Sequence, residues 1–337
     1  MLPPLWVRRV VLAPAMVLVA LFVVTTLPLW LLAAAGLSPL LPFSRWRLLR
    51  LLWFLVLHMV LEAVLLAALA VLWVASGFGW KIRAPRFERL HYDLVQLYLR
   101  IVFWEAKRVL HVRVSVAGPD PSSYADRPLI VLSRHAGPGD SFLLVHALVN
   151  WYDREPRIVL KDTMQWDPAI DVVLNRLPNR FISPNPGVTG DLVEGQIGEL
   201  ASNLDDNDAF VIFPEGGNFT EHRRARAIER LRRKGLLDEA AKAEAMRHVL
   251  APRPGGVLAA LTRAPDADVV WVAHTGTDHL HSVADIWREL PMDQTILMRW
   301  WQVPSDEVPR GRAEQIAWLY EWWARIDTWI GANRVVP

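Results

Sequence analysis

The sequence predicts an α/β protein in which a mostly parallel or mixed sheet, flanked by helices, follows an N-terminal hairpin of two hydrophobic helices. Two long apolar runs lie within the first 80 residues, and from residue 90 onward short apolar runs alternate with helical patterns. Strands that alternate with helices favour a sheet with helices on its faces. The 337 residues are enough for one large domain and an accessory part.

The composition narrows the class of protein. Apolar residues make up 53% of the chain, and the surplus lies near the N-terminus. The chain has no cysteine, which excludes disulfides, a thiolate nucleophile and thiolate metal sites. A net charge of +2 is too small to indicate a nucleic-acid partner. The 17 tryptophans are typical of proteins at a membrane interface.

The first hydrophobic run, residues 10–37, contains no charged side chain. As a straight helix it would measure about 42 Å, which exceeds a bilayer core of about 30 Å. Pro14 and Pro28 interrupt it, so we expect a kinked or partly interfacial helix. The run is too long for a signal peptide, and a second hydrophobic run follows at once.

The second run, residues 51–77, is apolar except for His58 and Glu62. These two lie four residues apart on one helical face, so we expect a polar pair within the hairpin rather than a proton relay. Residues 1–89 are therefore predicted to form a membrane hairpin, with the lipid bilayer as partner.

Basic residues surround both runs, and two topologies stay open. Arginines and lysines occur before, between and after them: Arg8, Arg9, Arg45, Arg47, Arg50, Lys81, Arg83, Arg86 and Arg89. Two full spans would place both termini in the cytoplasm, in line with the positive-inside rule. The three arginines of the connection keep a re-entrant hairpin as the alternative. Both topologies put the domain of residues 90–337 on the cytoplasmic face.

This second domain begins with an amphipathic helix over residues 91–110. Five strand-like runs follow, at residues 112–116, 129–132, 157–160, 210–213 and 269–273. Helical patterns separate them, for example at residues 142–149 and 192–204. The stretch 177–187 is rich in Pro and Asn and is predicted to be a loop.

Polar side chains follow two of these strands, where sites open in such sheets. His135 follows the run 129–132, and Asp140 follows His135 across a Gly-Pro-Gly loop. An imidazole beside an orienting carboxylate is what a general base requires. Taken alone, Asp140 could be only the N-cap of the next helix. In the second place the strand 210–213 stops at Pro214, and Glu215 stands before two glycines.

The His-x4-Asp box and the box Phe213-Pro214-Glu215-Gly216 together resemble those of the glycerolipid acyltransferases, the lysophosphatidate acyltransferase-like family. The later segments are similar to the longer, eukaryotic-type members, and the resemblance covers roughly residues 90–330. These segments are Phe219-Thr220, the basic helix 223–234, Pro252-Arg253-Pro254-Gly255-Gly256, Arg299 to Pro304 and the Trp-rich helix 318–330.

The resemblance implies transfer of a fatty acyl group from acyl-CoA, or from acyl carrier protein, to a hydroxyl of a lysophospholipid or glycerol-phosphate acceptor. The expected acceptor is 1-acylglycerol-3-phosphate. His135 would take the proton of the hydroxyl while Asp140 holds the ring. By resemblance Glu215, with Gly216, would bind the acceptor. The N–H groups of Gly137 and Gly139 are candidates for an oxyanion pocket. No metal and no cofactor is expected, since the acyl thioester is a co-substrate.

The chain departs from the family at four places. Arg134 replaces an Asn, Gly137 replaces a Ser, and Gly217-Asn218 replace Thr-Arg. Ser183-Pro184 stand where the family has Asp-Arg. Both arginines that the family uses for the acceptor phosphate are therefore missing.

Two explanations compete for these departures. In the first, which we favour, the positive charge for the acceptor phosphate comes from Arg134, Lys161 and Arg180. In the second, the acceptor has a different head group. A non-catalytic lipid-binding member of the same fold is the alternative to an enzyme.

Three further clusters have ordinary explanations. His274, Asp278, His279 and His281 have metal-like spacing, but we expect no metal there. The basic helix 221–234 is either a solvated face or a contact for anionic lipid or coenzyme A phosphates. The terminal helix, with Leu319, Trp322, Trp323, Ile326 and Ile330 at helical spacing, is expected to pack against the domain rather than anchor at the membrane.

Overall fold

The computed structural model describes residues 2–40, 46–118, 126–137, 139–183, 190–278 and 283–334. The chain divides into two compact units. The first takes its residues from 1–113, 160–184 and 283–294, and the second from 114–159, 185–282 and 295–337. The predicted domain boundary at residue 89 lies inside the helix Pro85–Val109. The first unit contains the two hydrophobic segments together with later parts of the chain.

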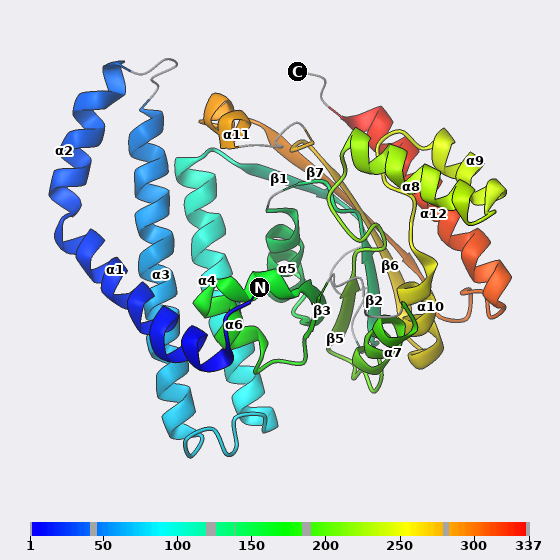
Figure 1. The fold of residues 1–337 in the computed structure, drawn as a ribbon, viewed down its shortest axis with the longest axis horizontal. Coiled ribbons are helices and arrows are strands. Elements are labelled where there is room, and N and C mark those ends of the chain that lie inside the picture. Colours follow the sequence, from blue (N-terminus) through cyan, green and yellow to red (C-terminus); the bar gives the residue numbers. More distant parts are fainter. Residues whose placement is uncertain are drawn as a thin grey trace. The chain divides into compact units, whose positions relative to one another are not determined.

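The first unit is mainly helical (Figure 1). Its elements in chain order are a π-helical turn η1 (Val7–Leu12), α1 (Ala13–Thr25), α2 (Leu27–Leu37), the 3-10 turn η2 (Ser38–Leu40), α3 (Arg47–Ala75), α4 (Pro85–Val109), the 3-10 turn η4 (Asp162–Trp166), α6 (Pro168–Leu174), β4 (Arg180–Ile182) and α11 (Val283–Glu289). Among the described residues, two helical stretches are long and apolar enough to cross a bilayer, Val7–Thr25 and Arg47–Ala75.

The first hydrophobic run is broken as predicted. Helix α1 ends at Thr25, and α2 starts at Leu27 with Pro28 in its first turn, where the missing N–H costs no hydrogen bond. Pro14 likewise lies at the start of α1. The break at Thr26 is the kink that the prolines predict.

Helix α3 is the centre of the first unit. Leu65, Leu66 and Leu69 pack with residues of α4 and α6 in one buried cluster. His58 and Glu62 contact each other, with 3.2 Å between Nε2 and Oε1, as the spacing predicts. Arg8, expected to flank the membrane, is instead buried and forms an ion pair with Asp171.

The described residues form a sheet of seven strands in the order β1-β7-β6-β2-β5-β3-β4. Its remaining strands are β1 (Arg113–Ala117), β2 (Leu129–Ser133), β3 (Glu155–Lys161), β5 (Asp208–Ile212), β6 (Asp268–Thr275) and β7 (Thr295–Val303). The remaining helices are α5 (Asp140–Asn150), α7 (Gly190–Leu200), α8 (Glu221–Arg233), α9 (Leu237–Ala245), α10 (Pro254–Arg263) and α12 (Arg312–Asn333). All five predicted strands are confirmed. The sequence did not predict β4, inside the expected loop 177–187, or β7; residues 184–187 of that loop lie outside the described part.

Strand register places the polar segments together. Strand β2 lies between β5 and β6, both parallel to it, with Val131 opposite Val211 and Val270. All residues of these three strands are buried, which explains their unbroken apolar runs. Parallel strands end at the same edge, so the segments after Ser133, Ile212 and Thr275 meet there.

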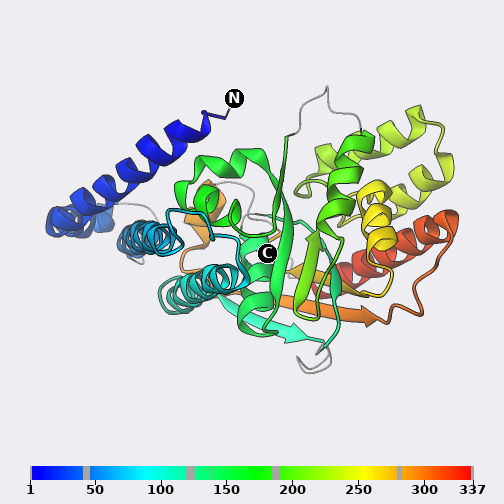
Figure 2. The same cartoon turned by 90° about the horizontal axis from the view of Figure 1, so that it is seen from below.

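Helix α12 packs on the sheet, as predicted. Leu319, Trp323 and Ile326 are fully buried, and the ring of Trp322 stacks on that of Trp271 in β6 at 5.2 Å. Strand β7 contributes Trp301, whose ring also contacts Trp322. Tryptophans of this unit therefore form its core rather than a membrane belt. Figure 2 shows α12 lengthwise, in red.

Candidate active site

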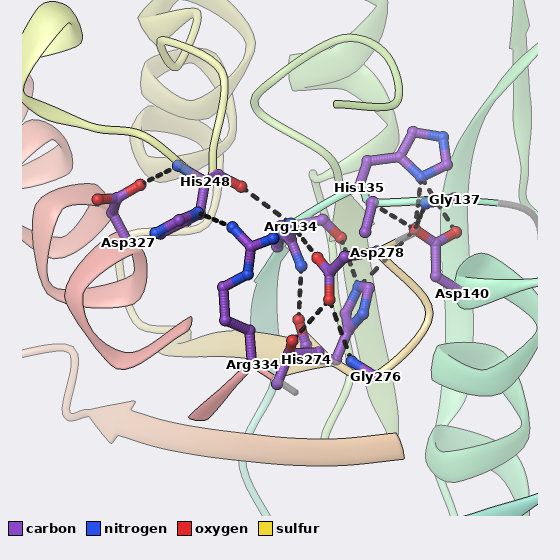
Figure 3. A network of polar contacts seen from close by, with 12 residues as sticks. Arg134, His135, Gly137, Asp140, His248, His274, Gly276, Asp278, Asp327 and Arg334 are labelled. Atoms are coloured by element: carbon purple, nitrogen blue, oxygen red, sulfur yellow. Dashed lines mark hydrogen bonds and ion pairs between the residues drawn. The ribbon is translucent and has the colours of Figure 1, made fainter. Parts of the chain in front are cut away.

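His135 and Asp140 meet at the end of β2 (Figure 3). The strand stops at Ser133, and α5 begins at Asp140 after Gly139, whose φ of 91° suits a residue without a side chain. The Nδ1 atom of His135 lies 2.9 Å from Oδ2 and 3.1 Å from Oδ1 of Asp140. The His135 side chain is 18% exposed, so substrate can reach a ring whose partner is buried.

The Asp140 carboxylate is held by backbone donors as well as by His135. It accepts hydrogen bonds from the N–H groups of Ala136 at 2.7 Å, Gly137 at 3.1 Å and Ser141 at 2.6 Å. Burial alone would raise the pKa of Asp140, but the hydrogen bond with His135 and the nearby His274 lower this pKa to about 2. An ionised Asp140 keeps the proton of His135 on Nδ1 and leaves Nε2 free to act as a base. Because Gly137 N–H donates to Asp140, its predicted oxyanion role is wrong in this arrangement.

Glu215 is buried and holds the backbone of the histidine loop. Its Oε2 accepts a hydrogen bond from the His135 N–H at 3.0 Å, and its Oε1 accepts one from the Leu250 N–H at 3.1 Å. Burial raises the pKa of Glu215 to about 8, against the opposing influence of Arg134 and the two N–H donors. Phe219 N–H also donates to the His135 carbonyl at 2.9 Å. The predicted binding of the acceptor by Glu215 and Gly216 stays a prediction.

Arg134 points into the protein. Only 1% of the residue is exposed, and its guanidinium donates to the carbonyls of His274 at 2.7 Å and His248 at 2.9 Å. The same group forms an ion pair with Asp278 at 2.5 Å (Figure 3). Burial opposes ionisation of Asp278, but Arg134 lowers its pKa to about 2. The structure therefore gives Arg134 an internal partner in place of the predicted phosphate.

The network continues to His274, which the sequence singled out only as part of a cluster with metal-like spacing, and to Asp327, which it did not single out. His274 lies beside the dyad, with its Nε2 3.7 Å from Asp140 Oδ2 and 3.2 Å from the Arg134 carbonyl. Asp327 of α12 accepts hydrogen bonds from the N–H groups of Arg247 and His248. No spacing in the sequence connects residues so far apart. His279 and His281 of the suspected metal cluster lie outside the described residues.

The other predicted phosphate ligands belong to the first unit. Lys161 is the exposed last residue of β3, and Arg180 is the partly buried first residue of β4. Their role stays a prediction. In the described part of this unit, His58, Glu62 and Asp167 have potential metal-ligand atoms within 4.8 Å of one another. Tyr98 OH lies 2.8 Å from Nδ1 of His58, which fixes that ring.

Residues 113–259 match the family model described as Acyltransferase. The matched segment contains His135, Asp140 and Glu215 together with β1, β2, β3 and β5. No curated protein and no solved structure matches the chain.

Proposed function

Over residues 113–259 the chain carries a domain of the glycerolipid acyltransferase family, and from this premise we propose that it transfers a fatty acyl group from acyl-CoA, or from acyl carrier protein, to the hydroxyl of a lysophospholipid. The proposed acceptor is 1-acylglycerol-3-phosphate. The observation that carries this proposal is the contact of His135 with Asp140, at the end of a buried parallel strand.

The geometry supports a single-base mechanism. The Nε2 atom of His135 accepts the proton of the acceptor hydroxyl as its oxygen attacks the thioester carbonyl carbon. Collapse of the tetrahedral intermediate breaks the C–S bond, and the proton on Nε2 passes to the leaving thiolate. A thiol has a pKa of about 8.5, so its thiolate leaves readily. Asp140 keeps the ring oriented and stabilises the imidazolium that forms in between.

Exposed apolar helices near the N-terminus support a lipid acceptor. Helices α1 and α2 expose apolar side chains that would be costly to leave in water, among them Leu18, Leu21, Phe22, Leu29, Trp30 and Leu32. Embedding these helices would bring the protein to the membrane in which lysophospholipids reside. The catalytic domain is proposed to face the cytoplasm.

A re-entrant, one-sided arrangement fits the first unit better than two spans. Helices α3 and α4 lie side by side (Figures 1 and 2). Exposed charged residues occur along α4, at Arg86, Arg89, Asp93, Arg100 and Lys107. If α3 crossed the bilayer, these charges would enter hydrocarbon at a cost of several kcal/mol each. The hairpin would instead lie with its outer apolar face in one leaflet.

The experiment is thiol release from acyl-CoA by purified protein, with and without lysophospholipid. We expect release that depends on the acceptor, and a loss of at least about 100-fold in His135→Ala, with unchanged thermal melting and membrane association. Acyl transfer retained by His135→Ala would refute the role of His135 as the general base. Lysophospholipid binding without turnover, across CoA and carrier-protein donors, would favour a non-catalytic protein.

A further inference from the structure

Two arginines flank the turn that follows Glu215. A Cβ atom on Gly216 would lie 2.9 Å from Cζ and Nη1 of Arg253, so the guanidinium rests against the glycine backbone. A Cβ atom on Gly217 would lie 3.4 Å from Nη1 of Arg223. Gly216 also has a φ of 67°, which disfavours any side chain. Glycines at 216 and 217 thus leave room for guanidinium groups that come from elsewhere in the chain.

This turn is fixed to the catalytic loop on both sides. Before the turn, Glu215 accepts the His135 N–H, and after it Phe219 N–H donates to the His135 carbonyl. Arg253 is joined to the same segment, because its backbone N–H donates to the Pro214 carbonyl at 2.9 Å. The position of the Arg253 guanidinium is therefore coupled to that of the base.

The arginines have spare hydrogen-bonding capacity. Arg223 donates from Nη1 to the Asn218 carbonyl at 3.0 Å, which leaves its other N–H groups for a ligand. Arg253 is an exposed residue, and within the described part of the chain no acceptor is found to act on its guanidinium. Partial desolvation of the guanidinium against the turn, and then the like charge of Arg230, lower the pKa of Arg253, although the residue as a whole is exposed. Glu194 packs against Gly255 nearby.

We propose that Arg253, assisted by Arg223, binds a phosphate group of the substrate beside Glu215. Planar guanidinium groups suit phosphate oxygens because they donate two parallel hydrogen bonds. The inference rests on the proposed acyl transfer. Arg253 and Arg223 would supply the positive charge that the family has at the position of Asn218. The buried Arg134 would then not be needed as a phosphate ligand. The phosphate is that of the lysophospholipid or that of coenzyme A.

The test compares Arg253→Gln with Arg253→Lys and with a control, Arg226→Gln, on the exposed face of α8. KM and kcat are measured for lysophosphatidate, for uncharged monoacylglycerol, and for acyl-CoA against its dephospho form. Loss of a charge-assisted contact predicts a KM for lysophosphatidate that is about 10- to 100-fold higher in Arg253→Gln. We expect kcat and the KM for monoacylglycerol to change by less than about threefold, and Arg253→Lys to recover part of the loss.

Each outcome decides the proposal. A higher KM for acyl-CoA alone, absent with dephospho-CoA, keeps phosphate binding and assigns it to the donor. Unchanged KM values in a folded Arg253→Gln protein overturn it. Equilibrium dialysis of glycerol 3-phosphate against the wild type and Arg253→Gln gives a readout without turnover. If the wild type transfers no acyl group but binds this probe through Arg253, the proposed function fails and the phosphate site stands.

Discussion

Replacing Glu215 by Gln separates two roles for this residue. The amide keeps one carbonyl oxygen and replaces the other by an NH2 group. One of the two N–H donors, that of His135 or that of Leu250, then faces another donor in a buried place. Leaving a buried donor unsatisfied costs about 1–3 kcal/mol. At about 2–4 °C per kcal/mol for a domain of this size, the melting temperature should fall by about 2–12 °C.

The effect on catalysis follows from the same contact. Because Glu215 holds the His135 backbone, its loss shifts the base relative to the acceptor, and a displacement of about 1 Å can cost about 100-fold in rate. We expect kcat to fall by about 10- to 100-fold, while the acceptor KM stays within about threefold. Melting in detergent and initial rates measure the two effects, with Glu229→Gln on the exposed face of α8 as the control. A raised acceptor KM with unchanged kcat and melting temperature would refute the backbone role and make Glu215 an acceptor ligand.

Three further predictions concern the dyad, the ion pair and the hairpin. The pKa of Asp140 is about 2, below the ordinary 3.8, so its ionised form stabilises the fold above about pH 4, and this contribution is lost as the pH falls toward about 2. Asp140→Asn should therefore lower the free energy of unfolding by about 2 kcal/mol at neutral pH, and its melting temperature should fall less steeply than that of the wild type between about pH 4 and pH 2. The same dependence of the melting temperature on pH in both proteins would contradict this. Arg134→Met should lower the free energy of unfolding by about 3–5 kcal/mol, because it leaves the largely buried charge of Asp278 without its partner, and adding Asp278→Asn should recover part of this loss. A raised KM for the acceptor in an Arg134→Met protein of unchanged stability would instead identify Arg134 as a phosphate ligand. Since the chain has no native cysteine, Trp46→Cys and Trp80→Cys, at opposite ends of α3, can be labelled singly with an impermeant maleimide, and labelling from opposite membrane faces would rule out a one-sided hairpin.

The central strands could be predicted because strands that are buried on both faces are continuous apolar runs in the sequence. Strands β2, β5 and β6 are buried on both faces and appear as continuous apolar runs. Strand β7 escaped prediction because it mixes Arg299 and Gln302 with tryptophans, and its antiparallel pairing with β6 depends on a distant partner. The three residues of β4 are too few for a pattern.

The pair of His135 and Asp140 could also be predicted from the sequence, because its geometry is local. His135 and Asp140 lie five residues apart across one turn, so local geometry brings them together. The role of Arg134 was not within reach. Its position next to the histidine suggested a substrate ligand, but the direction of its side chain depends on Asp278 and on carbonyls more than 100 residues away.

By itself the sequence determined the alternation of strands and helices, the apolar hairpin and the two boxes of the acyltransferase domain, because periodicity and short-range spacing encode these features. Only the tertiary structure decided that Glu215 holds the His135 backbone, that Arg134 is an internal ion-pair partner, and that Arg253 lies against Gly216. These three depend on contacts between strand ends and helices far apart in the chain. Burial, which gives the contacts of Glu215 and Arg134 their energy, is a property of the packed protein and not of any segment.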